Sequence, residues 1–387
     1  MNMRNEKMNI VAIGVLMAIQ LVITFEMSMV MPMAPLIASI YQVEQSNVTL
    51  LNLGYALSGL FVPFLGMMAD RMGNKRILIF SSFLFVIGSA LVYVWSNPWG
   101  FILGRTILGV GFFALISISP SYLSILVKPE KYGFVSGLHK IAFALAILIS
   151  PLVATTFAIN FGFQTLYLGV MIAMIICTGL AFLMPDVRSR HETIHHNSLV
   201  SIFRNSRAVM MMAAVALFSL PSVFYFNYLS IHLNQLGQTA QSIASLYSMI
   251  ALGSLGAGIG IMLFSDKLGK RRMGFWGAVF SAVFMALTLF NYEPAIFLVG
   301  FMFGLSFDLI WGLLFPLATG ILKGQTAGFL TLLSFVMSMT NVMANGLAPT
   351  VFRWGGFMLN VLVCTIGLMV GTLLLYQIFR KKDTSSI

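Results

Sequence analysis

The sequence predicts an all-α integral membrane protein with twelve transmembrane helices in two pseudo-symmetric six-helix bundles. Three observations predict it: the composition, the number of long apolar runs, and a charged loop that occurs twice. Of the 387 residues, 59% are hydrophobic and only 9% are charged, whereas a soluble domain is about 25% charged. Because one span takes about 20 apolar residues, the chain has room for about twelve spans and for no soluble catalytic domain.

The apolar runs, bounded by charges, Pro or Asn, form two sets of six. The first set lies near residues 10–33, 47–69, 76–95, 99–126, 134–158 and 163–184. The second set lies near residues 209–233, 241–264, 273–291, 295–321, 326–349 and 355–379. The longest polar stretch separates the sets. We therefore expect an N-terminal six-helix bundle over 1–185, a cytoplasmic linker over 186–207 and a C-terminal six-helix bundle over 208–387.

The basic residues are divided unevenly between the two sides of the predicted membrane. Counted from a cytoplasmic N-terminus, nineteen Lys and Arg residues fall in inner segments and only Arg353 falls in an outer one. Because cytoplasmic loops retain positive charge, this pattern predicts a multi-pass protein of the cell (inner or plasma) membrane with both termini cytoplasmic. The same loops explain the net charge of +11, so we expect no nucleic-acid partner.

A charged loop between spans 2 and 3 recurs between spans 8 and 9. Asp70-Arg71-Met72-Gly73-Asn74-Lys75-Arg76 corresponds to Asp266-Lys267-Leu268-Gly269-Lys270-Arg271-Arg272, 196 residues further on. Acids and bases at helix ends can form charge-assisted bonds that hold one conformation. We interpret the following as gating residues: Gly66, Asp70, Arg71, Gly73, Arg76, Asp266, Gly269 and Arg271. The alternative is a solvated loop that only sets the topology.

With these features the chain resembles the major facilitator superfamily over essentially its whole length. The segment from Gly66 to Arg76 is similar to that family's signature loop between spans 2 and 3. Span 4 opens with Arg105-Thr106-Ile107-Leu108-Gly109-Val110-Gly111, similar to the proton-coupled drug antiporter branch with twelve spans, in which the arginine is implicated in proton coupling. The antiporter element of span 5 is degenerate: Ser150-Pro151 is present, but Ala146, Ala154 and Thr155 replace glycines. The resemblance implies the major facilitator fold and alternating access.

Four ionisable residues lie within predicted spans: Glu26, Arg105, Lys140 and Asp308. A charge at the bilayer centre costs at least about 2.5–3.5 kcal/mol and faces a cavity or a partner. Glu26 lies roughly 10 Å and Arg105 roughly 8 Å below the outer ends of their spans, and in the family's fold both spans line the central cavity. The two can therefore face one another or share a water, either to couple transport to protons or bind substrate, or as a permanent ion pair that only fixes helix packing.

Asp308 lies near the middle of span 10, with Trp311 one turn further along the same face. An acid beside an aromatic ring suits a cationic, partly apolar ligand. The sequence leaves open which of Glu26 and Asp308 carries the proton, and it also permits a purely structural hydrogen bond for Asp308.

Four further residues are candidates for the binding site. Lys140 either extends to the membrane interface or contacts an anionic substrate. Asn341 and Asn345 share a face of span 11 and act as interhelical hydrogen bonds or as ligands. Tyr225 belongs to an aromatic cluster of span 7 that either walls a cavity or packs against lipid and neighbouring helices.

The sequence offers little support for an enzyme. His191-Glu192-Thr193-Ile194-His195 matches the H-E-x-x-H pattern of zinc proteases, but it lies in the polar linker, without a domain to supply a third ligand. No phosphate-binding glycine loop followed by Lys-Ser or Lys-Thr is present. We expect no metal site, no cofactor and no enzymatic activity.

These observations predict a monomeric secondary transporter in the lipid bilayer that exchanges protons for an exported small organic molecule, drug-like or a metabolite. One alternative keeps the fold and changes the cargo to an anionic metabolite or a metal-chelating small molecule, bound by Arg105 and Lys140 and either imported or exported. An alternative from another class is a non-transporting membrane receptor or scaffold.

Overall fold

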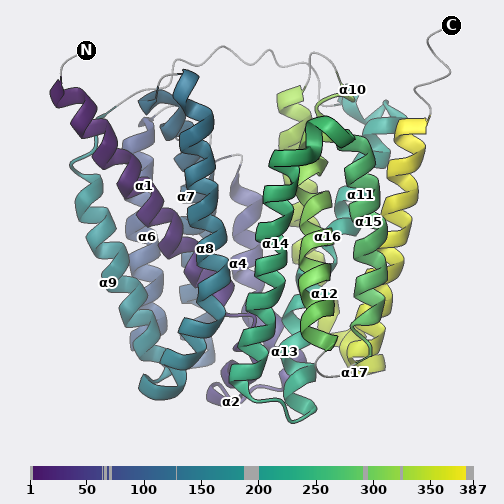
Figure 1. Cartoon of the computed structure of the whole chain (residues 1–387). Coiled ribbons are helices and arrows are strands. Elements are labelled where there is room, and N and C mark those ends of the chain that lie inside the picture. Colours follow the sequence, from purple (N-terminus) through teal and green to yellow (C-terminus); the bar gives the residue numbers. More distant parts are fainter. Residues whose placement is uncertain are drawn as a thin grey trace, which may run out of the picture. The chain divides into compact units, whose positions relative to one another are not determined.

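The computed structural model describes residues 3–62, 64, 68, 72–127, 129–186, 200–290, 295–322 and 326–380. Within this part the regular structure is helical and contains no strand, which confirms the all-α prediction. The chain divides into two compact units, Met1–Ile194 and His195–Ile387 (Figure 1). Residues 187–199 lie outside the described part, so the bundle boundaries at 185 and 208 stay a prediction.

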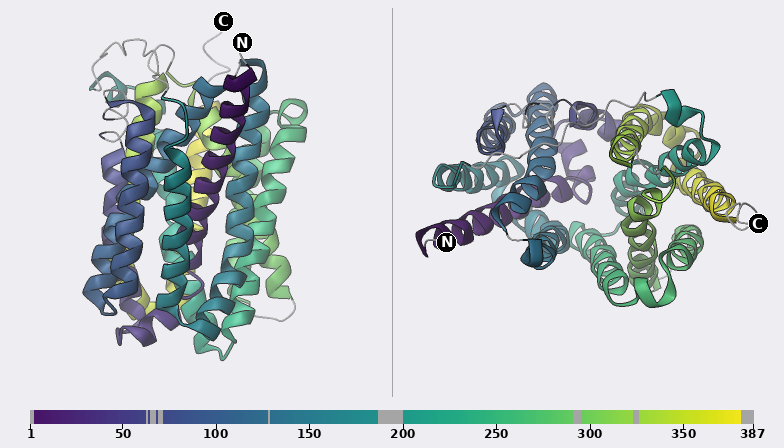
Figure 2. Two further views of the ribbon diagram at one scale, coloured as in Figure 1. Left: turned by 90° about the vertical axis from the view of Figure 1, so that its left-hand side faces the viewer. Right: turned by 90° about the horizontal axis from the view of Figure 1, so that it is seen from above.

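The first unit contains the six predicted spans, of which the second is broken. Its helices stand alongside one another (Figure 2), and α1 packs against α7, α8 and α9, while α6 packs against α7 and α9. Predicted span 2 is divided into α3, α4 and the 3₁₀ turn η2, with a break at Asn52. The elements of the first unit are α1 (Met3–Met29), α2 (Ala34–Ile40), η1 (Gln45–Asn47), α3 (Val48–Leu51), α4 (Leu53–Ser58), η2 (Gly59–Phe61), α6 (Asn74–Val94), α7 (Pro98–Leu126), α8 (Pro129–Phe161) and α9 (Phe163–Ala181).

The second unit differs from a row of six straight helices at two places. Predicted spans 11 and 12 run together as α17, with non-helical backbone at Gly355 and Gly356. Predicted span 7 is broken around Tyr225, where Asn360 Nδ2 donates to the Phe224 carbonyl at 3.0 Å. The elements of the second unit are α10 (Val200–Phe203), α11 (Ser206–Ser219), α12 (Pro221–Phe224), α13 (Phe226–Gln235), α14 (Ala240–Leu268), α15 (Lys270–Leu287), α16 (Ala295–Ala318) and α17 (Thr326–Arg380).

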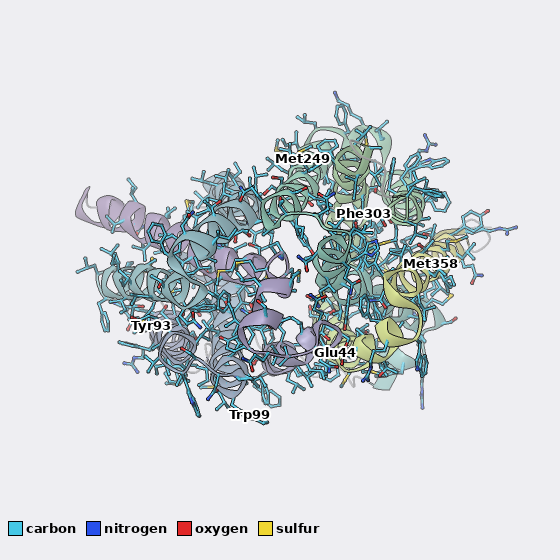
Figure 3. All side chains as sticks on the ribbon, turned by 90° about the horizontal axis from the view of Figure 1, so that it is seen from below. Glu44, Tyr93, Trp99, Met249, Phe303 and Met358 are labelled. Carbon is cyan, nitrogen blue, oxygen red and sulfur yellow. The ribbon has the colours of Figure 1, made fainter. Side chains whose placement is uncertain are left out.

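The helices have the length and surface of membrane spans. Among the described residues nine helices are long and apolar enough to cross a bilayer, and the last of them, Gly328–Arg380, is long enough for two spans. The broken span 2 and α15, whose first turn has three basic residues, account for the remainder of the twelve. Large apolar side chains face outward: Trp99 is 68% exposed and projects from the edge of its unit in Figure 3, whereas Phe303 lies among the helices of its unit.

The two units repeat the same packing. In the first, α6 and α4 both pack against α7, and in the second α15 and α14 both pack against α16. Glycines permit the closest approaches, because a Cβ atom at Gly253 would lie 2.0 Å from the Phe301 carbonyl oxygen and one at Gly304 would lie 2.0 Å from that of Ile250. The duplication inferred from the charged loop therefore extends to how the helices meet.

The rare backbone conformations also repeat at nearly the same offset as the loop. Gly73 (φ +92°) precedes α6 and Gly269 (φ +85°) precedes α15, 196 residues apart. Gly162 (φ +92°) corresponds to Gly356 (φ +61°) in the same way. Such positive φ values favour glycine, so each half of the chain makes its turns at equivalent places.

We predict that Gly73→Ala and Gly269→Ala each lower the free energy of unfolding by about 1–3 kcal/mol, because alanine is strained at this φ and ψ. Thermal unfolding of the purified protein in detergent measures the effect. The control is Gly137→Ala within α8, where a Cβ atom has open space and where alanine should be neutral or stabilise by up to about 1 kcal/mol. Equal effects at all three positions would contradict the assignment of strain.

Candidate functional site

Two glycines bring the broken span 2 against α7. A Cβ atom at Gly54 would lie 1.9 Å from Thr106 Oγ1, and one at Gly109 would lie 3.0 Å from the Cα atom of Tyr55. Ser58 then bridges the two helices by donating to the Thr106 carbonyl at 2.9 Å. Gly54 of span 2 and Gly109 of the span 4 motif therefore set how closely α7, with Arg105, approaches span 2.

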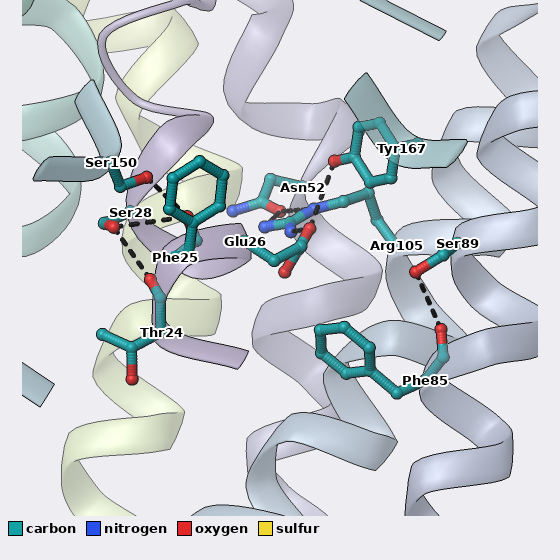
Figure 4. A network of polar contacts seen from close by, with 10 residues as sticks. All are labelled: Thr24, Phe25, Glu26, Ser28, Asn52, Phe85, Ser89, Arg105, Ser150 and Tyr167. Carbon is teal, nitrogen blue, oxygen red and sulfur yellow. Dashed lines mark hydrogen bonds and ion pairs between the residues drawn. The ribbon is translucent and has the colours of Figure 1, made fainter. Parts of the chain in front are cut away.

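Arg105 and Glu26 form a buried ion pair, which is one of the arrangements that their similar depths allow (Figure 4). Their side chains are 1% and 0% exposed. The Nε and Nη2 groups of Arg105 both donate to Asn52 Oδ1, at 3.0 and 2.7 Å, and its guanidinium lies 4.0 Å above the ring of Tyr55. The break in span 2 at Asn52 thus places an acceptor against the guanidinium, and the arginine is held by α1 and by the broken span 2.

The two oxygens of Glu26 have different surroundings. Oε1 takes the ion pair with Arg105 and also a hydrogen bond from the Tyr167 hydroxyl of α9 at 3.1 Å. Oε2 is buried and has no hydrogen-bond partner among the described residues. The backbone beside Glu26 is fixed by Ser150 of α8, whose hydroxyl donates to the Phe25 carbonyl at 2.6 Å. One carboxylate oxygen is therefore fully engaged, while the other is open to a proton.

Sequence reasoning missed three members of this network: Asn52, Tyr55 and Tyr167. Each stands in an apolar span, where a polar side chain must find a partner. The available signal was Asn52 within the apolar part of span 2, but the sequence does not reveal the break that turns its oxygen toward α7.

We predict that Tyr167→Phe lowers the free energy of unfolding by about 1.5–3 kcal/mol, because it removes a hydrogen bond to a charged group. Tyr93→Phe is the matched control, since Tyr93 is 36% exposed and its substitution should stay within about 0.5 kcal/mol. Unfolding curves in detergent compare the two. Indistinguishable curves would mean that the Tyr167 hydroxyl contributes nothing to holding Glu26.

A second acidic position lies in α16 of the second unit. Asp308 is only partly exposed, and Ser254 of α14 lies beside its carboxyl group, close enough to interact with it. Trp311 lies one turn on, its ring centroid 6.2 Å from that of Phe307. The indole Nε1 of Trp311 is buried without a hydrogen-bond acceptor among the described residues. Asp308 and Trp311 thus offer an acceptor and a donor on one helix face.

The other predicted site residues have different surroundings. Lys140 is exposed on α8, whereas Arg105 is buried in its ion pair. Asn345 donates from Nδ2 to the Asn341 carbonyl at 2.8 Å within α17. Tyr225 is 1% exposed, with its ring centroid 5.0 Å from that of Phe303, so here it forms part of the aromatic packing of its unit.

Comparison with known proteins gives the family. A sequence profile of the Major Facilitator Superfamily matches residues 16–339, most of the chain. The chain belongs to this superfamily. It is therefore a multi-pass membrane protein, and the predicted fold class is confirmed.

Relatives within the Major Facilitator Superfamily are similar over part of their length. An uncharacterized transporter of Buchnera aphidicola subsp. Schizaphis graminum is 31% identical over 171 residues, 43% of this chain and 43% of that one. The multidrug resistance protein MdtG of Salmonella typhi is 26% identical over 261 residues, 63% of this chain and 62% of the relative. The match thus spans less than two thirds of either relative.

Solved structures of the superfamily match over nearly the whole chain. A D-xylose-proton symporter aligns with a TM-score of 0.76 and 16% identity, covering 96% of this chain and 97% of the other. A peptide transporter in complex with sulfate aligns with a TM-score of 0.77 and 13% identity, covering 95% of each chain. At these identities the likeness shows the major facilitator fold and no more.

The gating residues of this superfamily member are described only in part. Gly73 and Gly269 make the equivalent turns before α6 and α15, Arg76 is exposed, and the guanidinium of Arg271 lies 5.0 Å from the ring of Phe379. The remaining four lie outside the described part as whole residues (Gly66, Asp70, Arg71) or as a side chain (Asp266). Their gating role stays a prediction.

The H-E-x-x-H segment, from His191 to His195, also lies outside the described residues. Within the described part, no group of three or more His, Cys, Asp or Glu side chains is placed to hold a metal ion.

Proposed function

We propose that this transporter exports a small organic molecule, drug-like or a metabolite, in exchange for protons by alternating access. The observation that carries the proposal is the buried Glu26–Arg105 pair. Its arginine lies in span 4, whose sequence resembles the proton-coupled antiporters. The multidrug resistance name of the Salmonella relative supports an exported, drug-like cargo.

The geometry of the pair supports proton exchange at Glu26. When Glu26 takes up a proton, on the oxygen that lacks a partner, its attraction for Arg105 falls. Arg105 still has Asn52 and the ring of Tyr55, so it stays in place with α7 while the link from α7 to α1 weakens. Protonation thus changes how strongly two spans of one unit are joined. Such a change can shift the populations of the two conformations between which a carrier alternates. The competing view, a permanent pair that fixes packing, predicts no link to transport.

Asp308 and Trp311 support a cationic, partly apolar cargo. A carboxylate attracts the positive charge, and an aromatic ring nearby attracts the same charge through its face. The unpartnered indole N–H adds a donor for a polar group of the cargo. In this assignment Glu26 carries the proton and Asp308 binds the cargo.

The anionic alternative requires Arg105 and Lys140 to bind together. Arg105 is already occupied by Glu26 and Asn52, and Lys140 is exposed on a different helix, so the cationic cargo is favoured. Lys140→Glu separates the two cargoes: transport of a cation should tolerate it, while transport of an anion should be lost.

Three further features belong to the proposal. The protein acts as a monomer in the cell membrane, with both termini in the cytoplasm. The two charged loops, before α6 and before α15, form the cytoplasmic gate.

The test uses proteoliposomes and ethidium, a fluorescent lipophilic cation. With the lumen made acidic, ethidium uptake by the wild-type protein should rise several-fold over uptake without a pH gradient, and nigericin should abolish the increase. Uptake that is indifferent to the gradient, in vesicles whose protein does move ethidium, would reject proton exchange.

A further inference from the structure

A basic cavity lies at one end of the second unit, where α14 ends and α15 begins. It has a volume of about 680 Å³. Four basic residues of the repeated loop line it, namely Lys267, Lys270, Arg271 and Arg272, and Arg207 at the start of α11 also lines it. The cavity is formed wholly within the second unit.

The described lining contains no acid to balance these charges. Among the described residues, no ion pair joins Lys267, Lys270, Arg271 or Arg272 to an acid. Asp266 precedes these four residues in the sequence and its side chain is not described, but a single carboxylate would still leave an excess of three positive charges among them. An occupant of this cavity must therefore be anionic.

The start of α15 adds to the positive potential. Gly269 has no side chain to cap the helix, and the first turn of α15 contains no acid. The first backbone N–H groups of a helix have no partner within it and favour an anion. A phosphate group, with several acceptor oxygens, matches both these groups and the guanidinium groups of Arg271 and Arg272.

The remaining wall is apolar. Pro316, Leu317, Ile378 and Phe379 line it beside the basic residues. Further along α15 and α17, Trp276 and Tyr376 are 50% and 49% exposed, and such aromatic side chains mark the level of the membrane interface. The cavity therefore lies where phospholipid headgroups lie, with an apolar surface beside it for an acyl chain.

The equivalent position of the first unit is used differently. Lys75, which corresponds to Arg271 in the repeat, donates to the carbonyl oxygens of Phe182 and Met184 at 2.8 and 2.5 Å. Its charge caps the end of α9, whereas the charge of Arg271 lines an open cavity. The repeat has thus kept the basic residue, and in the second unit its guanidinium lies at the cavity wall, 5.0 Å from the ring of Phe379.

We infer that this cavity binds the phosphate headgroup of an anionic phospholipid. Inorganic phosphate shares the charge and the acceptor oxygens, but it has no acyl chain to cover the apolar wall. The inference is independent of which cargo the transporter carries.

The test measures lipid retained by the purified full-length protein, by native mass spectrometry, together with the melting temperature in detergent. Added phosphatidylglycerol or cardiolipin should be retained and should raise the melting temperature, whereas phosphatidylcholine and inorganic phosphate at millimolar concentration should not. In the Arg271→Gln/Arg272→Gln variant, retention should fall about 10- to 30-fold, since each basic residue near an anionic lipid strengthens binding about three- to fivefold.

The matched control is Arg76→Gln/Arg353→Gln, which removes two exposed charges elsewhere and should retain lipid as the wild type does. Equal losses of lipid retention in both double variants would contradict a specific site, because they would show that lipid responds only to the total surface charge. Full stabilisation by inorganic phosphate alone would overturn the lipid as the source of the phosphate. Should the first variant fail to fold, Lys267→Gln/Lys270→Gln replaces it, with the same loss expected.

Discussion

Arg105→Ala should destabilise the protein by about 3–5 kcal/mol, the largest effect expected from any single substitution outside the glycine contacts. The substitution leaves the Glu26 carboxylate buried at 0% exposure with only the Tyr167 hydroxyl as donor, and it leaves the oxygen of Asn52 without its two N–H donors. Burying an unpaired charge in this way costs far more than the pair itself contributes. Thermal unfolding in detergent measures the loss, with Arg76→Ala, an exposed arginine, expected to stay within about 0.5 kcal/mol.

A double variant shows whether the pair serves only stability. Glu26→Leu/Arg105→Met removes both charges and keeps the volume, and replacements of this kind are often neutral or stabilising. It should regain most of the stability that Arg105→Ala loses and yet give no transport that responds to a pH gradient. If the double variant is as unstable as Arg105→Ala, the loss of stability does not come from the unpaired carboxylate.

Glu26→Gln should uncouple transport from protons, the second large effect. An amide cannot release a proton, so the pH gradient should no longer stimulate ethidium uptake, while downhill movement of ethidium continues. The stimulation that is lost reflects a coupling free energy of about 1–3 kcal/mol, or about 5- to 150-fold. Glu44→Gln, at an exposed glutamate of the same unit, is the control and should keep the full response.

Asp308→Asn separates the two acids in the same vesicles. If Asp308 binds the cation, the variant should lose affinity for ethidium and keep the response of the residual transport to the gradient. Asp186→Asn, at an exposed aspartate, should change neither. If Asp308→Asn loses the response to the pH gradient and Glu26→Gln keeps it, Asp308 carries the proton and Glu26 binds the cargo.

The spans and the ion pair were predictable because both follow from counting along a helix. A rise of 1.5 Å per residue puts Glu26 and Arg105 at similar depths, and charges in an apolar surround require partners. The equivalence of the two halves was visible in one loop of seven residues. The turns at Gly162 and Gly356 follow the same repeat, but they have no charged motif to reveal it.

The broken helices could not be predicted from apolar runs. Hydropathy does not distinguish a continuous span from one interrupted at Asn52 or Tyr225, since the side chains on either side remain apolar. These breaks decide which polar groups meet: Asn52 faces Arg105, and the freed Phe224 carbonyl accepts from Asn360. The interrupted backbone is held by residues that are distant in the sequence, so the apolar runs do not show which groups will meet.

The most direct test measures proton movement driven by cargo. Vesicles containing the purified protein and a pH-sensitive dye are loaded with tetraphenylphosphonium and diluted into cargo-free buffer, so that cation leaving the lumen drives protons inward. The lumen should acidify with the wild-type protein and with Glu44→Gln, and it should keep its pH with Glu26→Gln. Acidification by Glu26→Gln at the wild-type rate would show that the buried pair does not carry the exchanged proton.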